Sequence, residues 1–444
     1  MLRILFVLLT FAATAPVARA AVEDDVTHAR LDNGLQIVVI QDRRAPVVTH
    51  MIWYKVGAID EVAGQSGIAH FLEHLMFKGT DTLAPGEFSR VVADNGGTGN
   101  AFTSADFTGY FQRVASDRLG LMMQMEADRM RNLRISDEDI ETERAVVLQE
   151  RASRVDNSPE AVFREQREAA LYLNHPYGRP VIGWAHEIEV LTREQIMAFY
   201  RRHYAPNNAI LVVAGDVDPE DVIAMARVHY GPIAAAANLP ARVHPAEPPQ
   251  LAARRMSFTD PRVRQPYVSR SYLAPGRQSG DQKPAAALSM LSRLLGGGVT
   301  SWLTEELVYE QAVALDAGAY YRGASLGPGV FGVYITPREG ISLDEAEGHL
   351  DAALAAFLEV GPDPAELERL KAQARAQEIY ALDSQRGRAQ RYGAGLASGL
   401  TVADIEGWSD LVQALSVEDV QNAARGLFDL RRSVTGHIWR GDDP

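Results

Sequence analysis

Two histidines and a glutamate lie within five consecutive residues, His70-Phe71-Leu72-Glu73-His74. On a helix each residue advances by about 100°, so His70, Glu73 and His74 fall within one arc of the helix surface. Both imidazoles can then reach one metal ion, and neutral histidine nitrogen suits zinc. The glutamate can stand beside an open coordination position, where a metal-bound water needs a base. The pattern predicts a catalytic zinc site; the alternative is a partly exposed helix with hydrogen-bonded histidines.

A catalytic zinc ion commonly has three protein ligands and keeps its fourth position for water. The later segment "EDIETERAVVLQER" offers carboxylates as the third ligand. Glu143 and Glu150 are seven residues apart, which is two helical turns, so they share one face of that helix. A solvated acidic helix face is the alternative interpretation.

A glycine-rich segment, "GTGNAFTSADFTGYF" at 97–111, indicates a turn that leads into a strand. An exposed edge strand can pair with an extended peptide through backbone hydrogen bonds. The stretch around Asn100, Ala101 and Phe102 is therefore a candidate substrate-binding strand. An ordinary core or edge strand flanked by glycines is the alternative.

These residues resemble the pitrilysin/insulinase family of zinc peptidases, which carry an inverted His-x-x-Glu-His motif, and most closely its short, mitochondrial processing peptidase-like branch. The similarity extends over nearly the whole chain after residue 20. It comprises, in the family's order, the segments "LDNGLQIVVIQD", "GIAHFLEHLMFKGT", "NGGTGNAFTSADFTGYF", "HPYGRPVIGW", "FYRRHYAPNNAILVVAGDV" and "LLGGGVTSWLTEEL".

The resemblance implies a role for each candidate site residue. His70, His74 and Glu150 would bind one zinc ion, and Glu73 would activate its water. Glu143 would be a second acid that orients a ligand histidine or the substrate. The segment that includes Asn100 and Ala101 would contact the peptide. The implied activity is that of a zinc metalloendopeptidase acting on peptides or unfolded segments.

The resemblance also implies an α+β fold of two homologous halves, each with an antiparallel sheet and several helices, that enclose a chamber. A repeat in the sequence supports this organisation. Two segments, starting at Leu191 and Leu415, each predict a capped amphipathic helix followed by a strand. Four positions of the first segment match the second with one constant displacement: Leu191, Thr192, Glu194 and Ile196 match Leu415, Ser416, Glu418 and Val420.

The Ala- and Pro-rich segment after about Tyr230 predicts a linker between the halves. The expected division is a metal-binding catalytic domain at 21–232, a linker at 233–262 and a homologous domain without a metal site at 263–444. Before them, residues 1–20 combine Arg3, a short apolar run and Ala18-Arg19-Ala20, which is typical of a cleaved secretory signal. The expected location is the periplasm or outside the cell.

Composition excludes some functions. The formal charge is 44 − 58 = −14, which argues against nucleic acid as a partner. The chain has no cysteine, so a metal must be held by nitrogen and oxygen ligands.

Possible partners follow from the family's pattern. Single-chain relatives hold substrate with an arginine and a tyrosine in their C-terminal half; here Tyr334 is a candidate, while the arginine's expected position is apolar. The chain could close its chamber with a homologous subunit that lacks the metal motif, or as a homodimer. A non-catalytic, structural subunit with the same fold is the competing function, although such a subunit has no need for Glu73.

Overall fold

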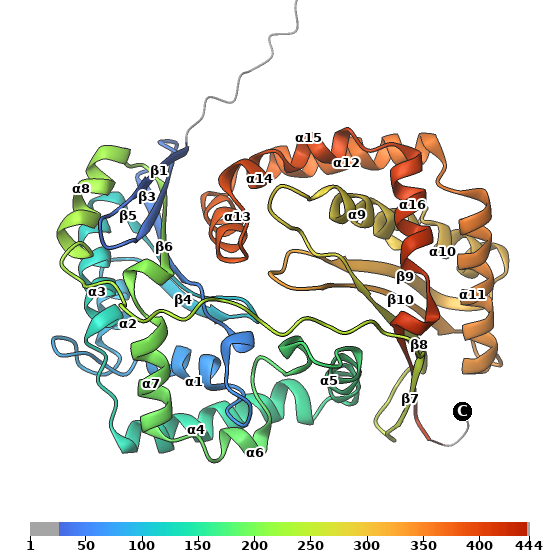
Figure 1. Ribbon diagram of the computed structural model, residues 1–444, viewed down its shortest axis with the longest axis horizontal. Coiled ribbons are helices and arrows are strands. Elements are labelled where there is room, and N and C mark those ends of the chain that lie inside the picture. Colours follow the sequence, from blue (N-terminus) through green and yellow to red (C-terminus); the bar gives the residue numbers. More distant parts are fainter. Residues whose placement is uncertain (1–25, 442–444) are drawn as a thin grey trace, which may run out of the picture.

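The structure is a computed structural model that describes residues 26–441, so the predicted signal at 1–20 lies outside the described residues. The chain forms two α+β halves that lie side by side (Figure 1). Within residues 26–441, no helix combines the length and the apolar character that crossing a bilayer requires.

The N-terminal half contains a sheet of six strands. Their spatial order is β1 (Val26–Arg30), β2 (Gln36–Gln41), β6 (Ala209–Gly215), β3 (Val47–Tyr54), β5 (Thr108–Ala115) and β4 (Thr98–Thr103). Strands β2 and β6 are parallel, and the other neighbours are antiparallel. The helices of this half are α1 (Ile68–Leu75), α2 (Glu87–Asp94), α3 (Leu119–Arg131), α4 (Asp137–Arg151), α5 (Pro159–Leu171), α6 (Ala185–Ile188), α7 (Arg193–His203) and α8 (Pro219–His229).

The C-terminal half repeats this strand order without a counterpart of β1. Its sheet runs β7 (Arg254–Thr259), β11 (Ser433–Trp439), β8 (Tyr267–Ala274), β10 (Gly329–Pro337) and β9 (Ala314–Arg322). Only β7 and β11 are parallel. Its helices are α9 (Lys283–Gly296), α10 (Trp302–Thr304), α11 (Leu343–Val360), α12 (Pro364–Ala381), α13 (Gln385–Ala397), α14 (Val402–Glu406), α15 (Trp408–Gln413) and α16 (Val417–Leu427). The matching topologies confirm the predicted pair of homologous α+β halves.

The predicted repeat corresponds to helix α7 with strand β6 and helix α16 with strand β11. Thr192 and Ser416 are the N-caps, as the sequence predicts. The side chains that complete the two capping boxes are Gln195 and Asp419, one position beyond the matched glutamates. This follows from helix geometry, because only the third helical residue can reach back to the N–H of the cap.

Both faces of the N-terminal sheet are apolar, which explains why the sequence of β6 is hydrophobic without interruption. Leu211 and Val213 face the core shared with α1, α3 and α7, whereas Ile210 and Val212 face a second core. Helix α13, from the other half, covers that second face. In return α5 packs on β11, β8 and β7 of the C-terminal sheet. Each half thus contributes one helix to its neighbour's sheet, and Figure 1 shows α5 and α13 between the two sheets.

The predicted linker is shorter than residues 233–262, because β7 belongs to the C-terminal sheet. Its alternation of half-buried and exposed residues is typical of an edge strand, which composition did not reveal. The segment before it, 231–253, contains neither helix nor strand and crosses between the halves. We propose this segment as the domain boundary.

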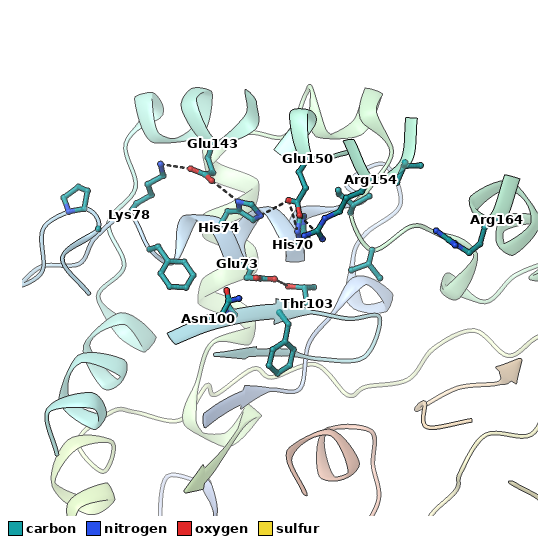
Figure 2. A pocket seen from close by; sticks show the side chains of 18 residues that line it. His70, Glu73, His74, Lys78, Asn100, Thr103, Glu143, Glu150, Arg154 and Arg164 are labelled. Carbon is teal, nitrogen blue, oxygen red and sulfur yellow. Dashed lines mark hydrogen bonds and ion pairs between the residues drawn. The ribbon is translucent and has the colours of Figure 1, made fainter. Parts of the chain in front are cut away.

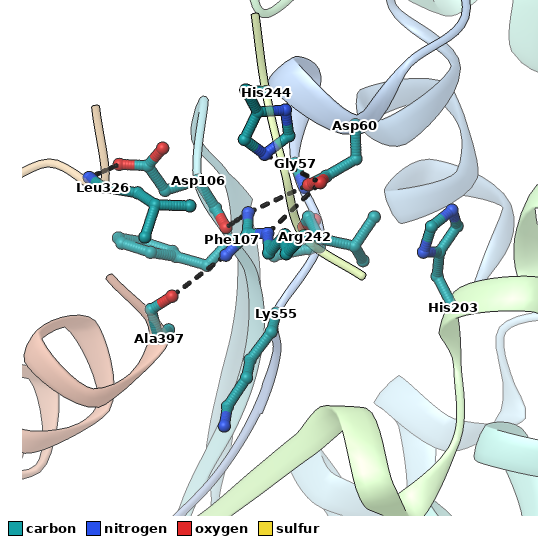
Figure 3. Close-up of polar contacts among 12 residues, drawn as sticks. Lys55, Gly57, Asp60, Asp106, Phe107, His203, Arg242, His244, Leu326 and Ala397 are labelled. Atoms are coloured by element: carbon teal, nitrogen blue, oxygen red, sulfur yellow. Dashed lines mark hydrogen bonds and ion pairs between the residues drawn. The ribbon is translucent and has the colours of Figure 1, made fainter. Parts of the chain in front are cut away.

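Arg242 of this crossing segment joins the halves through several hydrogen bonds (Figure 3). Its guanidinium donates to both carboxylate oxygens of Asp60, to the carbonyl of Asp106 and, at 3.1 Å, to the carbonyl of Ala397 at the end of α13. The Asp106 carboxylate in turn accepts the Leu326 N–H of the C-terminal half at 3.0 Å. These contacts fix α13 against the N-terminal sheet.

Candidate functional site

Helix α1 presents the His-x-x-Glu-His residues on one side and buries its other side. Ile68, Phe71 and Leu75 are fully buried in the N-terminal core. The N-cap, Gly67, has no side chain to accept the first N–H groups of the helix. The carboxylate of Glu61 replaces it, accepting at 3.0 Å from the N–H of Gly67 and at 3.0 Å from that of Ala69.

Helix α4 lies beside α1 and supplies two carboxylates. A capping box between Ser136 and Asp139 starts this helix. Ile140 and Val147 are buried on its core side. Glu143 and Glu150 both reach α1, as their separation of two turns predicts.

Three side chains converge at the centre of this site (Figure 2). One Glu150 carboxylate oxygen lies 3.6 Å from Nε2 of His70 and 3.2 Å from Nε2 of His74. These distances fit the edges of a zinc tetrahedron, since metal–ligand bonds of about 2.0 to 2.1 Å put ligand atoms about 3.3 Å apart. The same Glu150 oxygen is buried and has no hydrogen-bond partner among residues 26–441. Two imidazole nitrogens and one carboxylate oxygen thus fit a single zinc ion.

The electrostatic surroundings differ between the two histidines. Burial, followed by the neighbouring His74, lowers the pKa of His70 to about 3, so its imidazole is neutral, as a metal ligand must be. Burial acts in the same direction on His74, but its hydrogen bond to Glu143 and the charge of Glu150 outweigh burial and raise its pKa.

Glu143 holds the His74 ring in position. Its Oε1 lies 2.9 Å from Nδ1 of His74, which leaves Nε2 directed at Glu150. Lys78 donates to the other Glu143 oxygen at 2.6 Å. The His74 hydrogen bond, together with Lys78, lowers the pKa of Glu143 to about 2, so this carboxylate stays ionised. A carboxylate behind a ligand histidine fixes its tautomer and makes it a stronger ligand.

Glu73 lies beside the three converging side chains but is not one of them. Its Oε2 accepts a hydrogen bond of 2.5 Å from the hydroxyl of Thr103, the last residue of β4. Burial raises the pKa of Glu73, and the Thr103 hydrogen bond opposes that rise. Helix α1 and strand β4 are therefore joined through the side chain of Glu73.

A cavity of about 950 Å³ brings the predicted site residues together. Its lining includes His70, Glu73, His74, Glu143 and Glu150 from the two helices and Asn100, Ala101, Phe102 and Thr103 from β4. The Phe102 ring also packs edge-on against Trp53, at 4.9 Å between ring centres. Phe102 thus has a packing role beside its place in the cavity wall.

Strand β4 is an edge strand with hydrogen-bonding groups on its open side. Among the strands of residues 26–441 it pairs with β5 alone, and the hairpin closes with Ser104 N–H donating to Phe107 C=O. Because hydrogen-bonded and non-hydrogen-bonded pairs alternate in antiparallel strands, the backbone groups of Ala101 and Thr103 point away from β5. The Ala101 N–H indeed donates to the side chain of Asn100, at 2.9 Å.

Four residues of the site were not predicted from the sequence: Glu61, Lys78, Thr103 and Arg154. Arg154 binds the second oxygen of Glu150 at 2.8 Å. Helical spacing could have indicated Lys78, four residues after His74, and Arg154, four residues after Glu150. No local signal points to Glu61 or Thr103, whose contacts depend on how loops and strands meet.

A second group with the composition of a metal site lies in the C-terminal half and comprises Asp344, Glu347 and His437. Arginines already neutralise it. Arg255 donates to both oxygens of Glu347, and Arg270 donates at 2.7 Å to one of them. We therefore interpret this group as a structural ion-pair network.

Both halves of the chain match models of one peptidase family. Residues 36–184 match the family described as "Insulinase (Peptidase family M16)", and residues 191–374 match "Peptidase M16 inactive domain". The chain is 32% identical over 413 residues to the "Zinc protease PqqE" of Helicobacter pylori, covering 91% of this chain and 90% of that protein. It is 25% identical over 405 residues to the "Mitochondrial-processing peptidase subunit beta" of Lentinula edodes, covering 89% of this chain and 86% of that protein.

Solved structures show the same fold. A protease from Helicobacter pylori superimposes with a TM-score of 0.87 at 30% identity, over 94% of this chain and 99% of that one. The periplasmic protease PqqL from Escherichia coli superimposes with a TM-score of 0.82 at 21% identity, over 95% of this chain and 48% of that one. With both halves matched along the sequence, this chain belongs to the insulinase family of peptidases, family M16.

Proposed function

We propose that this protein is a zinc-dependent endopeptidase that hydrolyses peptides or unfolded segments. The observation that carries the proposal is the convergence of His70, His74 and Glu150 beside the carboxylate of Glu73, in the wall of a large cavity. A structural metal site would use four protein ligands and would need no base. The zinc protease name of its relative from Helicobacter pylori supports this assignment.

In the proposed reaction, zinc held by His70, His74 and Glu150 would polarise the scissile carbonyl and acidify a water molecule. As the water oxygen attacks the carbonyl carbon, Glu73 would take a proton from the water and pass it to the amine that leaves when the C–N bond breaks. The buried environment raises the pKa of Glu73, which brings this carboxylate closer to the pKa range in which a base works best near neutral pH. Thr103 fixes the direction of the Glu73 carboxylate, and Glu143 fixes that of His74.

The substrate would bind along β4. An extended peptide can pair with the outward backbone groups of Ala101 and Thr103, displacing the Asn100 side chain from the Ala101 N–H. Because Thr103 contacts Glu73, the same strand would place the scissile bond beside the base. Backbone pairing selects extended peptides with little regard to their side chains.

The proposed location is the periplasm or the exterior of the cell, based on the signal-like residues 1–20. Its structural neighbour PqqL is described as periplasmic. A homologous partner without the metal motif, or a second copy of this chain, would complete the chamber.

A partner-dependent or non-catalytic subunit is the second candidate. One observation favours it: residues 191–374 match a family segment described as inactive. That match begins after α6 and ends at residue 374, and all three proposed ligands lie before it.

The test compares the purified chain with its Glu73→Gln variant. Zinc content and hydrolysis of a quenched-fluorescent peptide library are measured with and without a chelator. We expect about one zinc per chain in both proteins and cleavage only by the wild type, abolished by the chelator. Zinc binding without any cleavage by the wild type would favour the second candidate, and co-purification from the native source would then identify a partner.

A further inference from the structure

The face of the C-terminal sheet that meets α5 is apolar beneath that helix and polar toward β9 and β10. Ser269 on β8, Arg322 on β9 and Thr336 on β10 all line a second cavity, of about 380 Å³, between these strands and α5. They alternate along their strands with core residues such as Val268 and Ile335. Helix α5 packs on β7, β8 and β11 and leaves the β9 side of this face open.

Two tyrosine rings on this face each lie against a glycine of the neighbouring strand. Tyr320 lies opposite Gly332, and Tyr334 lies opposite Gly318, in the β9–β10 register. A Cβ on Gly332 would come within 2.2 Å of the Tyr320 ring, and one on Gly318 within 2.8 Å of the Tyr334 hydroxyl. Each ring therefore lies over a glycine of the neighbouring strand, which keeps the space above the sheet open.

The charges around this cavity are unbalanced. Arg164, Arg167 and Arg322 line it together with one carboxylate, Glu168, which pairs with Arg322 at 2.7 Å. Arg167 is buried and donates to the hydroxyl of Ser269, while its Nε has no hydrogen-bond partner among the described residues. Within residues 26–441, Arg164 forms neither an ion pair nor a side-chain hydrogen bond, and it is exposed to the cavity.

Other neighbours do not cancel this positive charge. Asp316 acts on the Tyr334 hydroxyl and Glu160 on that of Tyr267, and neither acid lines the cavity. Among the residues that the structure describes, two of the three arginines thus form no ion pair with a carboxylate, in a chain whose overall charge is −14.

Arg164 also lines the cavity that contains the proposed metal site, so one side chain borders both cavities. Figure 2 shows it beyond Arg154, on the side of the site away from Lys78. We propose that the second cavity is a subsite for a carboxylate of the peptide substrate, bound by Arg164 and Arg167 over the two tyrosine rings. The planar guanidinium group pairs with a carboxylate through two parallel hydrogen bonds. This inference rests on the proposed peptidase function and adds a preference for acidic peptides.

The experiment uses the zinc-loaded protein and pairs of quenched-fluorescent peptides. The members of a pair differ only by Glu or Gln at one position, and the position is moved along both sides of the scissile bond. A further pair compares a free C-terminal carboxylate with a C-terminal amide, which separates the two sources of the charge. The variants are Arg164→Gln and Arg322→Gln, with Arg227→Gln on α8 as an exposed arginine outside both cavities.

For the wild type and Arg227→Gln we expect kcat/KM to favour the acidic member about tenfold at one position or at the C-terminus. In Arg164→Gln the ratio should fall to within about twofold of one. A ratio near one for every wild-type pair, or a preference that persists in both cavity variants, would overturn the proposal.

Binding separates this proposal from the peptidase function. The Glu73→Gln protein is titrated with the same peptides, labelled for fluorescence anisotropy. If the wild type cleaves nothing but Glu73→Gln binds acidic peptides more tightly in an Arg164-dependent manner, the subsite stands and the peptidase proposal fails. If cleavage occurs with no charge preference in rate or in binding, the subsite proposal fails and the peptidase proposal stands.

Discussion

The hydroxyl of Thr103 donates a 2.5 Å hydrogen bond to Oε2 of Glu73, across 30 positions of sequence. Thr103 ends the edge strand β4, and Glu73 lies on the helix that carries both histidines. The proposed substrate strand and the proposed base are therefore coupled directly. Movement of one would misplace the other.

Removal of this hydroxyl should impair the reaction without affecting the metal. In Thr103→Val we expect kcat for a peptide to fall about tenfold or more, since a hydrogen bond to a charged group contributes about 1.5 to 3 kcal/mol. The zinc content should stay near one per chain. Thr103→Ser retains the hydroxyl and is the control. Equal rates for Val and Ser variants would show that Thr103 does not position Glu73.

Glu143 should affect metal affinity through His74. In Glu143→Gln we expect zinc to bind about 10 to 100 times more weakly, because the charge that strengthens and orients the ligand is lost. Competition of the metal-free protein with a chromophoric chelator measures this without any assay of activity. Glu141→Gln is the matched control, since Glu141 lies on the same helix with its side chain 74% exposed. An unchanged affinity in Glu143→Gln would contradict this role.

The reciprocal helix packing between the halves depends on glycine. A Cβ on Gly393 of α13 would lie 2.1 Å from the buried Trp53 of β3, and one on Gly436 of β11 would lie 2.3 Å from Phe163 of α5. We expect Gly393→Ala to destabilise the protein by about 2 kcal/mol through overpacking, despite the higher helix propensity of alanine. Thermal unfolding and Trp fluorescence measure this change.

Gly426 of α16 is the control for that substitution, because a Cβ there would meet no atom within 4 Å. Gly426→Ala should leave the protein equally stable or stabilise it by up to about 1 kcal/mol. Equal changes in stability for Gly393→Ala and Gly426→Ala would argue against a tight contact between α13 and the sheet.

Glu347 should make stability depend on pH in the acidic range. Burial disfavours its charge, but hydrogen bonds from His437 and Arg255 and the charge of Arg270 outweigh burial and hold its pKa well below the usual range. A group whose pKa is lower in the folded state stabilises above its unfolded pKa and loses that contribution as pH falls towards the folded value. Wild type should thus exceed Glu347→Gln in melting temperature by a constant margin above about pH 5, and the margin should shrink below about pH 4.

A series of thermal melts from pH 3 to pH 7 measures that margin. Glu339→Gln, at an exposed position with no ion pair in the described chain, should melt with the wild type throughout. If the difference in melting temperature between wild type and Glu347→Gln grew towards low pH, the pKa of Glu347 would not be lowered by folding.

Much of the local structure could be predicted from the sequence. The helices that carry His70 and Glu143, the two capped helices of the repeat and the strands that follow them are confirmed. Such elements depend on interactions within a few residues, namely turn geometry, capping and the period of buried side chains. The extent of β7 was missed, because a short edge strand with polar alternation looks like a loop in composition.

The sequence by itself determined which histidine and glutamate residues are available to the site. His70, Glu73 and His74 are on one helical arc, and Glu143 and Glu150 are two turns apart, because helical periodicity places residues on a common face whatever surrounds the helix. Only the tertiary structure decided that Glu150 meets both histidines, that Glu61 caps α1 and that Thr103 reaches Glu73. It also decided that α5 and α13 cover each other's sheets and that three arginines line a cavity near the proposed metal site. These relationships join residues distant in sequence, and they follow from the packing of sheets and helices, which local periodicity does not specify.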